Sequence, residues 1–182
     1  THDVIKGRAY SNRHDTVKSL GNFCISYLKK KKIGSVAKHV PGHGCSNQDS
    51  HLGLPKVFKK SNKLYQEDFK LFKNLGTFFM MTAHILYKKI DKRNLTTFSN
   101  TIIKKIIRKK LNFKGILISD DISMKALSKD LNSNADKALN AGCNLVLYCN
   151  GNIRESTNLL KNLRFIDKFT QKKTYQFYNF LR

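Results

Sequence analysis

Three of the six histidines of this chain lie in one short segment, KHVPGHGCSNQDSHLGLP, which runs from Lys38 to Pro55. Within it, Asp49 and His51 are two residues apart, so in an extended segment both side chains point the same way and can meet. Such a pair fixes the imidazole tautomer and raises its basicity, which suits His51 to exchange protons near neutral pH. The alternative is that His51 only braces a loop.

A metal site is a second interpretation of the same segment. Its possible ligands are His39, His43, Cys45, Asp49 and His51. Their spacing matches no usual zinc pattern, because there is no HExxH motif and Cys45 stands alone. We therefore expect neither a metal ion nor a cofactor.

Two adjacent carboxylates, Asp120 and Asp121, end the apolar stretch GILISDD. Burying carboxylates without partners is costly, so we expect one of them to have a chemical role and the other to cap the following helix. A carboxylate on one side of a sugar and a proton donor on the other are what glycoside hydrolysis with retention requires. A histidine would be an unusual proton donor for that reaction.

Apolar runs of strand length alternate with segments of helical period, which is typical of an α/β protein with a parallel sheet. The expected strands are 33–40, 77–86, 115–120 and 144–149. The expected helices are 16–31, one capped by Ser99 and reaching Leu111, 124–140 followed by Gly142, one after Gly151, and 165–182. No repeat or linker is visible, so we expect one domain over residues 1–182.

Polar residues gather where these expected strands end. They are Lys38, His39, His84, Asp120, Asp121 and Asn150. In β/α barrels and open parallel sheets, the carboxyl ends of the strands are the face on which sites are built. The sequence therefore predicts a site at that face.

The formal net charge of +23 is the strongest signal in the composition. It would attract nucleic acid or an anionic membrane surface, but abundant Lys, Asn, Ile and Phe also fit a nucleotide bias of the genome. No apolar stretch is long enough to cross a membrane, and the four cysteines form no CxxC pair. We expect reduced thiols, no membrane span and a cytoplasmic location.

The blocks KHVPGHG, DSHLGLP, MTAHILY, GILISDDISMKAL and AGCNLVLYCNG resemble, in this order, the bacterial β-N-acetylglucosaminidases (β-hexosaminidases) of glycoside hydrolase family three. The resemblance implies a TIM (β/α)8 barrel. It also implies hydrolysis of terminal β-linked N-acetylglucosamine from peptidoglycan fragments, such as 1,6-anhydro-muropeptides, through a covalent glycosyl-enzyme. The implied partner is therefore a small carbohydrate or muropeptide, with no specific nucleic acid.

The family's functional residues fall on matching positions of this chain. The resemblance implies that Asp120 is the nucleophile and that His51 is the acid/base, with Asp49 as its partner. Sugar-binding roles fall on three residues, Arg8, Lys38 and His39. It further suggests supporting roles for two others, His84 and Asp91.

The resemblance begins partway through the family pattern. We therefore expect a partial barrel of about four β/α units plus C-terminal helices, with the N-terminal part of the barrel missing. Activity of this chain alone is then open, and a catalytically inactive fragment is one alternative. A basic nucleic-acid-binding module is another, with terminal aromatics such as Tyr175 and Phe177 as stacking platforms.

Overall fold

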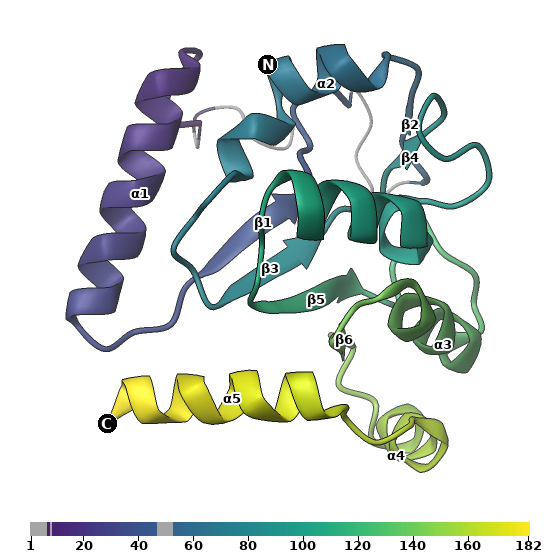
Figure 1. The fold of residues 1–182 in the computed structure, drawn as a ribbon. Helices are drawn as coiled ribbons and strands as arrows, with labels where there is room; N and C mark the ends of the chain where they lie inside the picture. Colours follow the sequence, from purple (N-terminus) through teal and green to yellow (C-terminus); the bar gives the residue numbers. More distant parts are fainter. Residues whose placement is uncertain (1–6, 8, 47–52) are drawn as a thin grey trace.

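The structure is a computed structural model that describes Gly7, residues 9–46 and residues 53–182. Its centre is a sheet of four parallel strands in the order β1-β3-β5-β6 (Figure 1). The strands are β1 (Val36–Val40), β3 (Phe79–Thr82), β5 (Ile116–Asp121) and β6 (Leu145–Leu147). The prediction of an α/β protein with a parallel sheet is confirmed.

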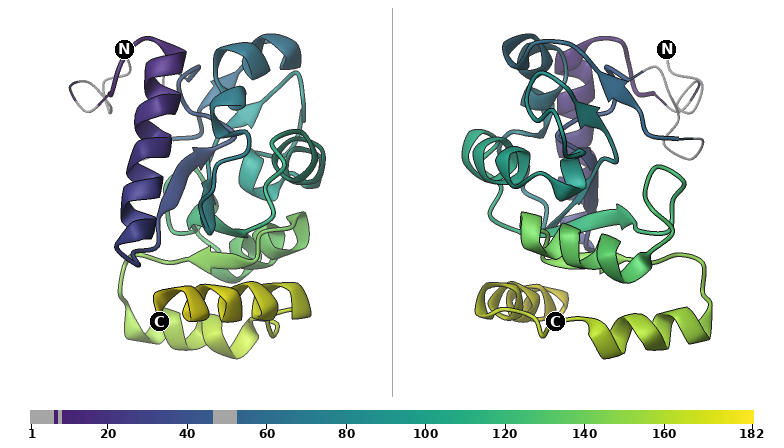
Figure 2. Two further views of the ribbon diagram at one scale, coloured as in Figure 1. Left: turned by 60° about the vertical axis from the view of Figure 1, so that its left-hand side comes forward. Right: turned by 90° about the vertical axis from the view of Figure 1, so that its right-hand side faces the viewer.

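Helices connect and cover these strands. They are α1 (His14–Lys30), α2 (Ser61–Glu67), α3 (Leu131–Ala141), α4 (Ile153–Asn162) and α5 (Lys168–Leu181), with the short η2 (Phe69–Phe72) and η3 (Thr96–Phe98) and the π-type η4 (Ile102–Lys110). Figures 1 and 2 show α1 along the β1 side of the sheet and α5 below the sheet. A second, two-stranded parallel sheet pairs β2 (Lys56–Val57) with β4 (Leu86–Tyr87), and β2 was not predicted.

Helix η4 supplies much of the core. Its four isoleucines are buried, whereas Lys104 and Lys105 are exposed on the opposite face. The Ser99 hydroxyl accepts a hydrogen bond from the backbone N–H of Ile102 at 3.1 Å, which satisfies one of the free donors at the helix start. The predicted capping role of Ser99 and the predicted apolar face are both confirmed.

The predicted strand over 77–86 is too long. The chain leaves the central sheet after Thr82, and β4 belongs to the other sheet. In between, the Ala83 N–H donates to the Val40 carbonyl at 2.9 Å, and the Ile85 carbonyl accepts from the Thr96 N–H at 2.8 Å. The backbone is therefore satisfied by loop partners at the carboxyl end of the sheet, which an apolar run cannot reveal.

The predicted helix over 124–140 is also wrong at its start, because α3 begins at Leu131. The Asp130 carboxylate accepts from the Ser133 N–H at 3.0 Å and caps the helix there. Buried Asn134 donates through Nδ2 to the carbonyls of Ile122 and Ser128, at 3.0 and 2.8 Å, and so holds the preceding segment as turns. The expected end is correct, since Gly142 follows α3 with a φ of 118°.

The terminal helix packs against the sheet through part of its aromatic face. Phe177 and Phe180 lie with ring centroids 5.3 and 4.8 Å from that of Phe78, just before β3. Tyr175 and Tyr178 remain exposed. In the described part of the chain, no helix has the length and apolar character that a membrane crossing needs.

Candidate active site

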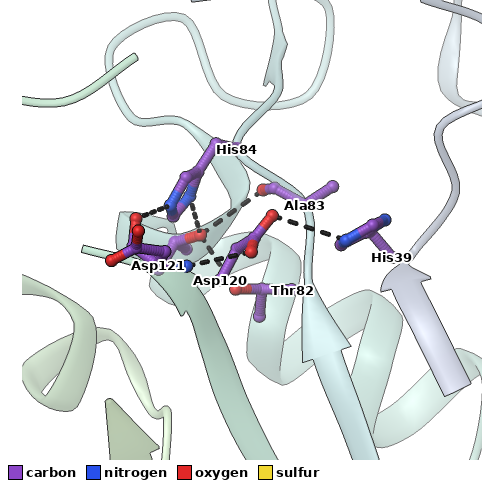
Figure 3. Close-up of polar contacts among 7 residues, drawn as sticks. His39, Thr82, Ala83, His84, Asp120 and Asp121 are labelled. Carbon is purple, nitrogen blue, oxygen red and sulfur yellow. Dashed lines mark hydrogen bonds and ion pairs between the residues drawn. The ribbon is translucent and has the colours of Figure 1, made fainter. Parts of the chain in front are cut away.

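A bulge at the end of β1 aims His39 across the sheet. Lys38 pairs with Met81 and Val40 pairs with Thr82. His39 is therefore an extra residue that has no pairing partner on β3. A bulge bends its strand and redirects a side chain. Figure 3 shows the His39 ring facing the carboxylate of Asp120 from β5, and the Nε2–Oδ2 distance is 3.5 Å.

The Asp120 carboxylate is largely enclosed, with 15% of the side chain exposed. Its Oδ1 accepts the backbone N–H of Asp121 at 2.9 Å. Among the described residues no lysine or arginine forms an ion pair with Asp120, and the His39 ring is its one basic partner. Its negative charge is therefore available to a group that enters the space at the strand ends.

His39 is neutral at ordinary pH. Burial lowers its pKa to about 4, although the charge of Asp120 acts in the opposite direction. A neutral ring has one N–H donor and one acceptor nitrogen. His39 can therefore bridge a hydroxyl group to the Asp120 carboxylate without neutralising it.

A buried network fixes the backbone that follows Asp120. The His84 ring, fully buried, donates from Nε2 to the Asp121 carbonyl at 3.0 Å, and its Nδ1 lies 2.8 Å from the Thr97 hydroxyl. Thr97 in turn contacts the Thr82 hydroxyl at 2.8 Å. Burial lowers the pKa of His84, which fits a neutral ring that accepts from Thr97 and donates to Asp121.

The second carboxylate of the pair has a bracing role. Asp121 accepts from the Ser123 N–H and hydroxyl, at 3.0 and 2.7 Å, and from the Cys149 N–H at 3.2 Å. It therefore joins the ends of β5 and β6. The prediction that one of the two carboxylates caps the following helix is wrong, because α3 starts only at Leu131. Asp121 stabilises a turn instead.

The other expected site residues are distributed as follows. Lys38 is exposed at the end of β1, beside His39. Asp91 accepts from Ser99 Oγ at 2.7 Å and from two backbone N–H groups in the loop after β4, and thus braces that loop. Arg8, Asp49 and His51 lie outside the described residues. Among the residues that are described, no group of three or more His, Cys, Asp or Glu side chains could hold a metal ion.

Sequence reasoning missed Thr82 and Thr97. Both are fully buried and carry the hydrogen bonds that orient His84. Thr82 ends β3 two residues before His84, which is a weak signal that a polar group is needed there. Thr97 lies in η3 and has no local signal, because only the folding of that loop over the strand ends brings it to His84.

Comparison with known proteins places this chain in a family. Residues 1–174 match the family described as "Glycosyl hydrolase family 3 N terminal domain". A β-hexosaminidase of Methylobacillus flagellatus is 34% identical over 167 residues, which cover 89% of this chain and 47% of that protein. A β-hexosaminidase of Psychromonas ingrahamii is also 34% identical, over 89% of this chain and 49% of its own length.

Solved structures agree. NagZ from Neisseria gonorrhoeae, in complex with N-trifluoroacetyl-D-glucosamine, superimposes with a TM-score of 0.82 at 26% identity, over 98% of this chain and 51% of that one. A family 3 β-N-acetylglucosaminidase from Paenibacillus sp. str. FPU-7 gives 0.83 at 26% identity, over 98% and 36%. This chain thus spans about half the length of the curated relatives that it matches, and its sheet is part of a TIM-barrel-like α/β fold. The chain belongs to the glycosyl hydrolase family 3 N-terminal domain family.

Proposed function

We propose that the chain is the catalytic part of a retaining β-N-acetylhexosaminidase with Asp120 as its nucleophile. One observation carries the proposal: the enclosed Asp120 carboxylate faces a neutral His39 at the carboxyl ends of parallel strands, 3.5 Å from its Nε2. Membership of a glycoside hydrolase family, and similarity to proteins named β-hexosaminidase, support the same reaction class.

The proposed reaction has two displacements. In the first, an Asp120 oxygen bonds to the anomeric carbon while the glycosidic C–O bond breaks, and His51 as imidazolium gives its proton to the leaving oxygen. In the second, the neutral His51 ring, held by Asp49, takes a proton from a water molecule whose oxygen displaces Asp120. The enzyme returns to its starting protonation state, and the sugar keeps its anomeric configuration.

The proposed substrate carries a terminal β-linked N-acetylglucosamine, as in peptidoglycan fragments of the 1,6-anhydro-muropeptide type. The ligand in the Neisseria NagZ structure is an N-acylated glucosamine, which supports this sugar class. Lys38 and Arg8 would bind hydroxyl groups through charged donors, and His39 would add a directional hydrogen bond. We propose that the enzyme acts in the cytoplasm, because its four cysteines are free and thiols stay reduced there.

The test is hydrolysis of p-nitrophenyl N-acetyl-β-glucosaminide by the wild-type chain, Asp120→Asn and Asp121→Asn. We expect Asp120→Asn to lower kcat/KM at least about a thousandfold, because the amide is no nucleophile. Asp121→Asn makes the same chemical change one residue along and should cost far less. Mass spectrometry of acid-quenched reactions should find an N-acetylhexosaminyl group on the peptide that contains Asp120.

Three results would contradict the proposal. Equal losses in both variants would show that Asp120 has no special part. Sugar binding without turnover would identify an inactive hydrolase domain. Salt-sensitive RNA retention without sugar binding or turnover would favour the nucleic-acid module, since phosphate contacts weaken steeply with salt.

A further inference from the structure

One buried carboxylate has no part in the proposed reaction. Asp68, between α2 and η2, is only 7% exposed and faces the turn formed by residues 41–46, which follows β1. The backbone N–H of Cys45 donates to Asp68 Oδ2 at 3.4 Å, and the Gly44 amide also bonds to this carboxylate. An anionic acceptor thus serves two successive amides of the turn, which is how carboxylates stabilise tight backbone conformations.

The turn is packed directly on this carboxylate. A Cβ atom on Gly42 would lie 2.3 Å from Asp68 Cγ, so no larger residue fits there while the carboxylate holds its place. In addition, the hydroxyl of buried Tyr87 donates to the Gly42 carbonyl at 2.6 Å. Tyr87 is itself held edge-on by Phe69, with ring centroids 5.2 Å apart. The turn is therefore held by Asp68, between α2 and η2, and by Tyr87 of β4.

The charges around Asp68 come from several elements. Lys59 and Glu67 form an exposed ion pair at 2.6 Å beside the Cys45 thiol, and His14 approaches from α1. Burial raises the pKa of Asp68 to about 6, while the amide hydrogen bonds and these cations oppose the rise. At neutral pH the carboxylate is mostly ionised and is a strong acceptor for the two amides.

We propose that Asp68 is a positioning residue whose carboxylate fixes the 41–46 turn, so that Lys38 and His39 at its near end are held for sugar binding. In the chain, the same turn leads directly to the segment that contains Asp49 and His51. The catalytic meaning of the inference rests on the proposed function, whereas the fixing of the turn does not.

The test is NMR on the wild-type chain, on Asp68→Asn and on Glu67→Gln, which removes the neighbouring exposed carboxylate. From pH 5 to 8, the wild-type amide protons of Gly44 and Cys45 should move downfield with a midpoint of about 6, as Asp68 ionises and accepts more strongly. This titration should vanish in Asp68→Asn and persist in Glu67→Gln. A pH-dependent shift that arises from another group would survive in Asp68→Asn, so the variant separates such effects from that of Asp68.

Two further measurements separate positioning from general stability. In Asp68→Asn the hydrogen exchange of the Gly44 and Cys45 amides should accelerate by about tenfold or more, while the amides of β3 and β5 keep their rates. The dissociation constant for N-acetylglucosamine should rise by a similar factor.

Uniform acceleration over the whole chain would reduce Asp68 to a general stability role and overturn the proposal. If Asp68→Asn does not fold, hydrogen exchange of the wild-type chain decides, and Gly44 and Cys45 amides that exchange as fast as exposed, unbonded amides overturn the proposal. A confirmed titration in a chain that hydrolyses no substrate would leave the positioning of the turn intact and overturn only the proposed function.

Discussion

At the scale of single residues, the site depends on the protonation of His39. An imidazolium 3.5 Å from Asp120 would pair with the carboxylate and hold it back from an anomeric carbon. Burial lowers the pKa of His39 and keeps the ring neutral instead. The ring can then donate a hydrogen bond while the carboxylate keeps its charge. The same principle governs His84, whose neutral ring fixes the backbone of Asp121.

We expect His39 to titrate with a pKa of about 4, well below the ordinary 6.5. In Asp120→Asn the pKa should fall further, because the negative neighbour that favours the charged ring is removed. The measurement is a pH series of long-range ¹H–¹⁵N spectra of the imidazole rings. A midpoint of 6.5 or above in the wild type would contradict a half-buried, neutral His39.

At the scale of elements, Asn144 joins parts of the fold that are far apart in the chain. Its Oδ1 accepts from Arg108 Nη2 of η4 at 2.7 Å and from the Leu117 N–H of β5 at 2.8 Å. Its Nδ2 donates to the Thr170 hydroxyl of α5 at 2.9 Å. The position directly before β6 therefore ties the sheet to two helices, η4 and α5.

Asn144→Ala should lower the free energy of unfolding by about 2 to 3 kcal/mol, because it leaves the Leu117 N–H and one side of Arg108 without an acceptor. Urea unfolding measures the change. Asn162→Ala removes the same amide from an exposed position in α4 and should change stability by less than about 0.5 kcal/mol. Similar effects of the two substitutions would show that Asn144 is not a junction.

At the scale of the whole molecule, the sheet is open. Strands β1 and β6 are its edges within the described chain, and α1 buries none of its residues. Leu20, Phe23 and Tyr27 of α1 are exposed, with Phe23 at 66%. Open strand edges and exposed apolar side chains promote association, while the net charge of +23 opposes it at low salt.

We therefore expect the chain to self-associate more as salt concentration rises, because screening removes the repulsion and leaves the apolar contact. Phe23→Ser should reduce this association without loss of the fold, whereas Lys18→Ser, at an exposed polar position of the same helix, should not reduce it. Sedimentation velocity at matched concentrations measures both. Equal association of Phe23→Ser and wild type would exclude the α1 face as the contact.

Part of this protein could be predicted from local patterns. The apolar run that ends in Asp120 and Asp121, the isoleucine face behind Ser99 and the stop at Gly142 were correct, because alternation, helical period and capping act over a few residues. The start of α3 at Leu131 was missed, since the capping side chain of Asp130 and buried Asn134 outweighed an apolar period that continued upstream.

The sequence by itself determined that His39, Asp120 and Asp121 lie near the carboxyl ends of β1 and β5, since the apolar runs of these strands stop there, whereas it placed the end of β3 too late. Only the tertiary structure decided how they meet: the bulge that turns His39 toward Asp120, the burial that keeps its ring neutral, and the place of Thr97 beneath His84. The physical reason is that desolvation and contact between distant segments arise from packing, which no local pattern contains.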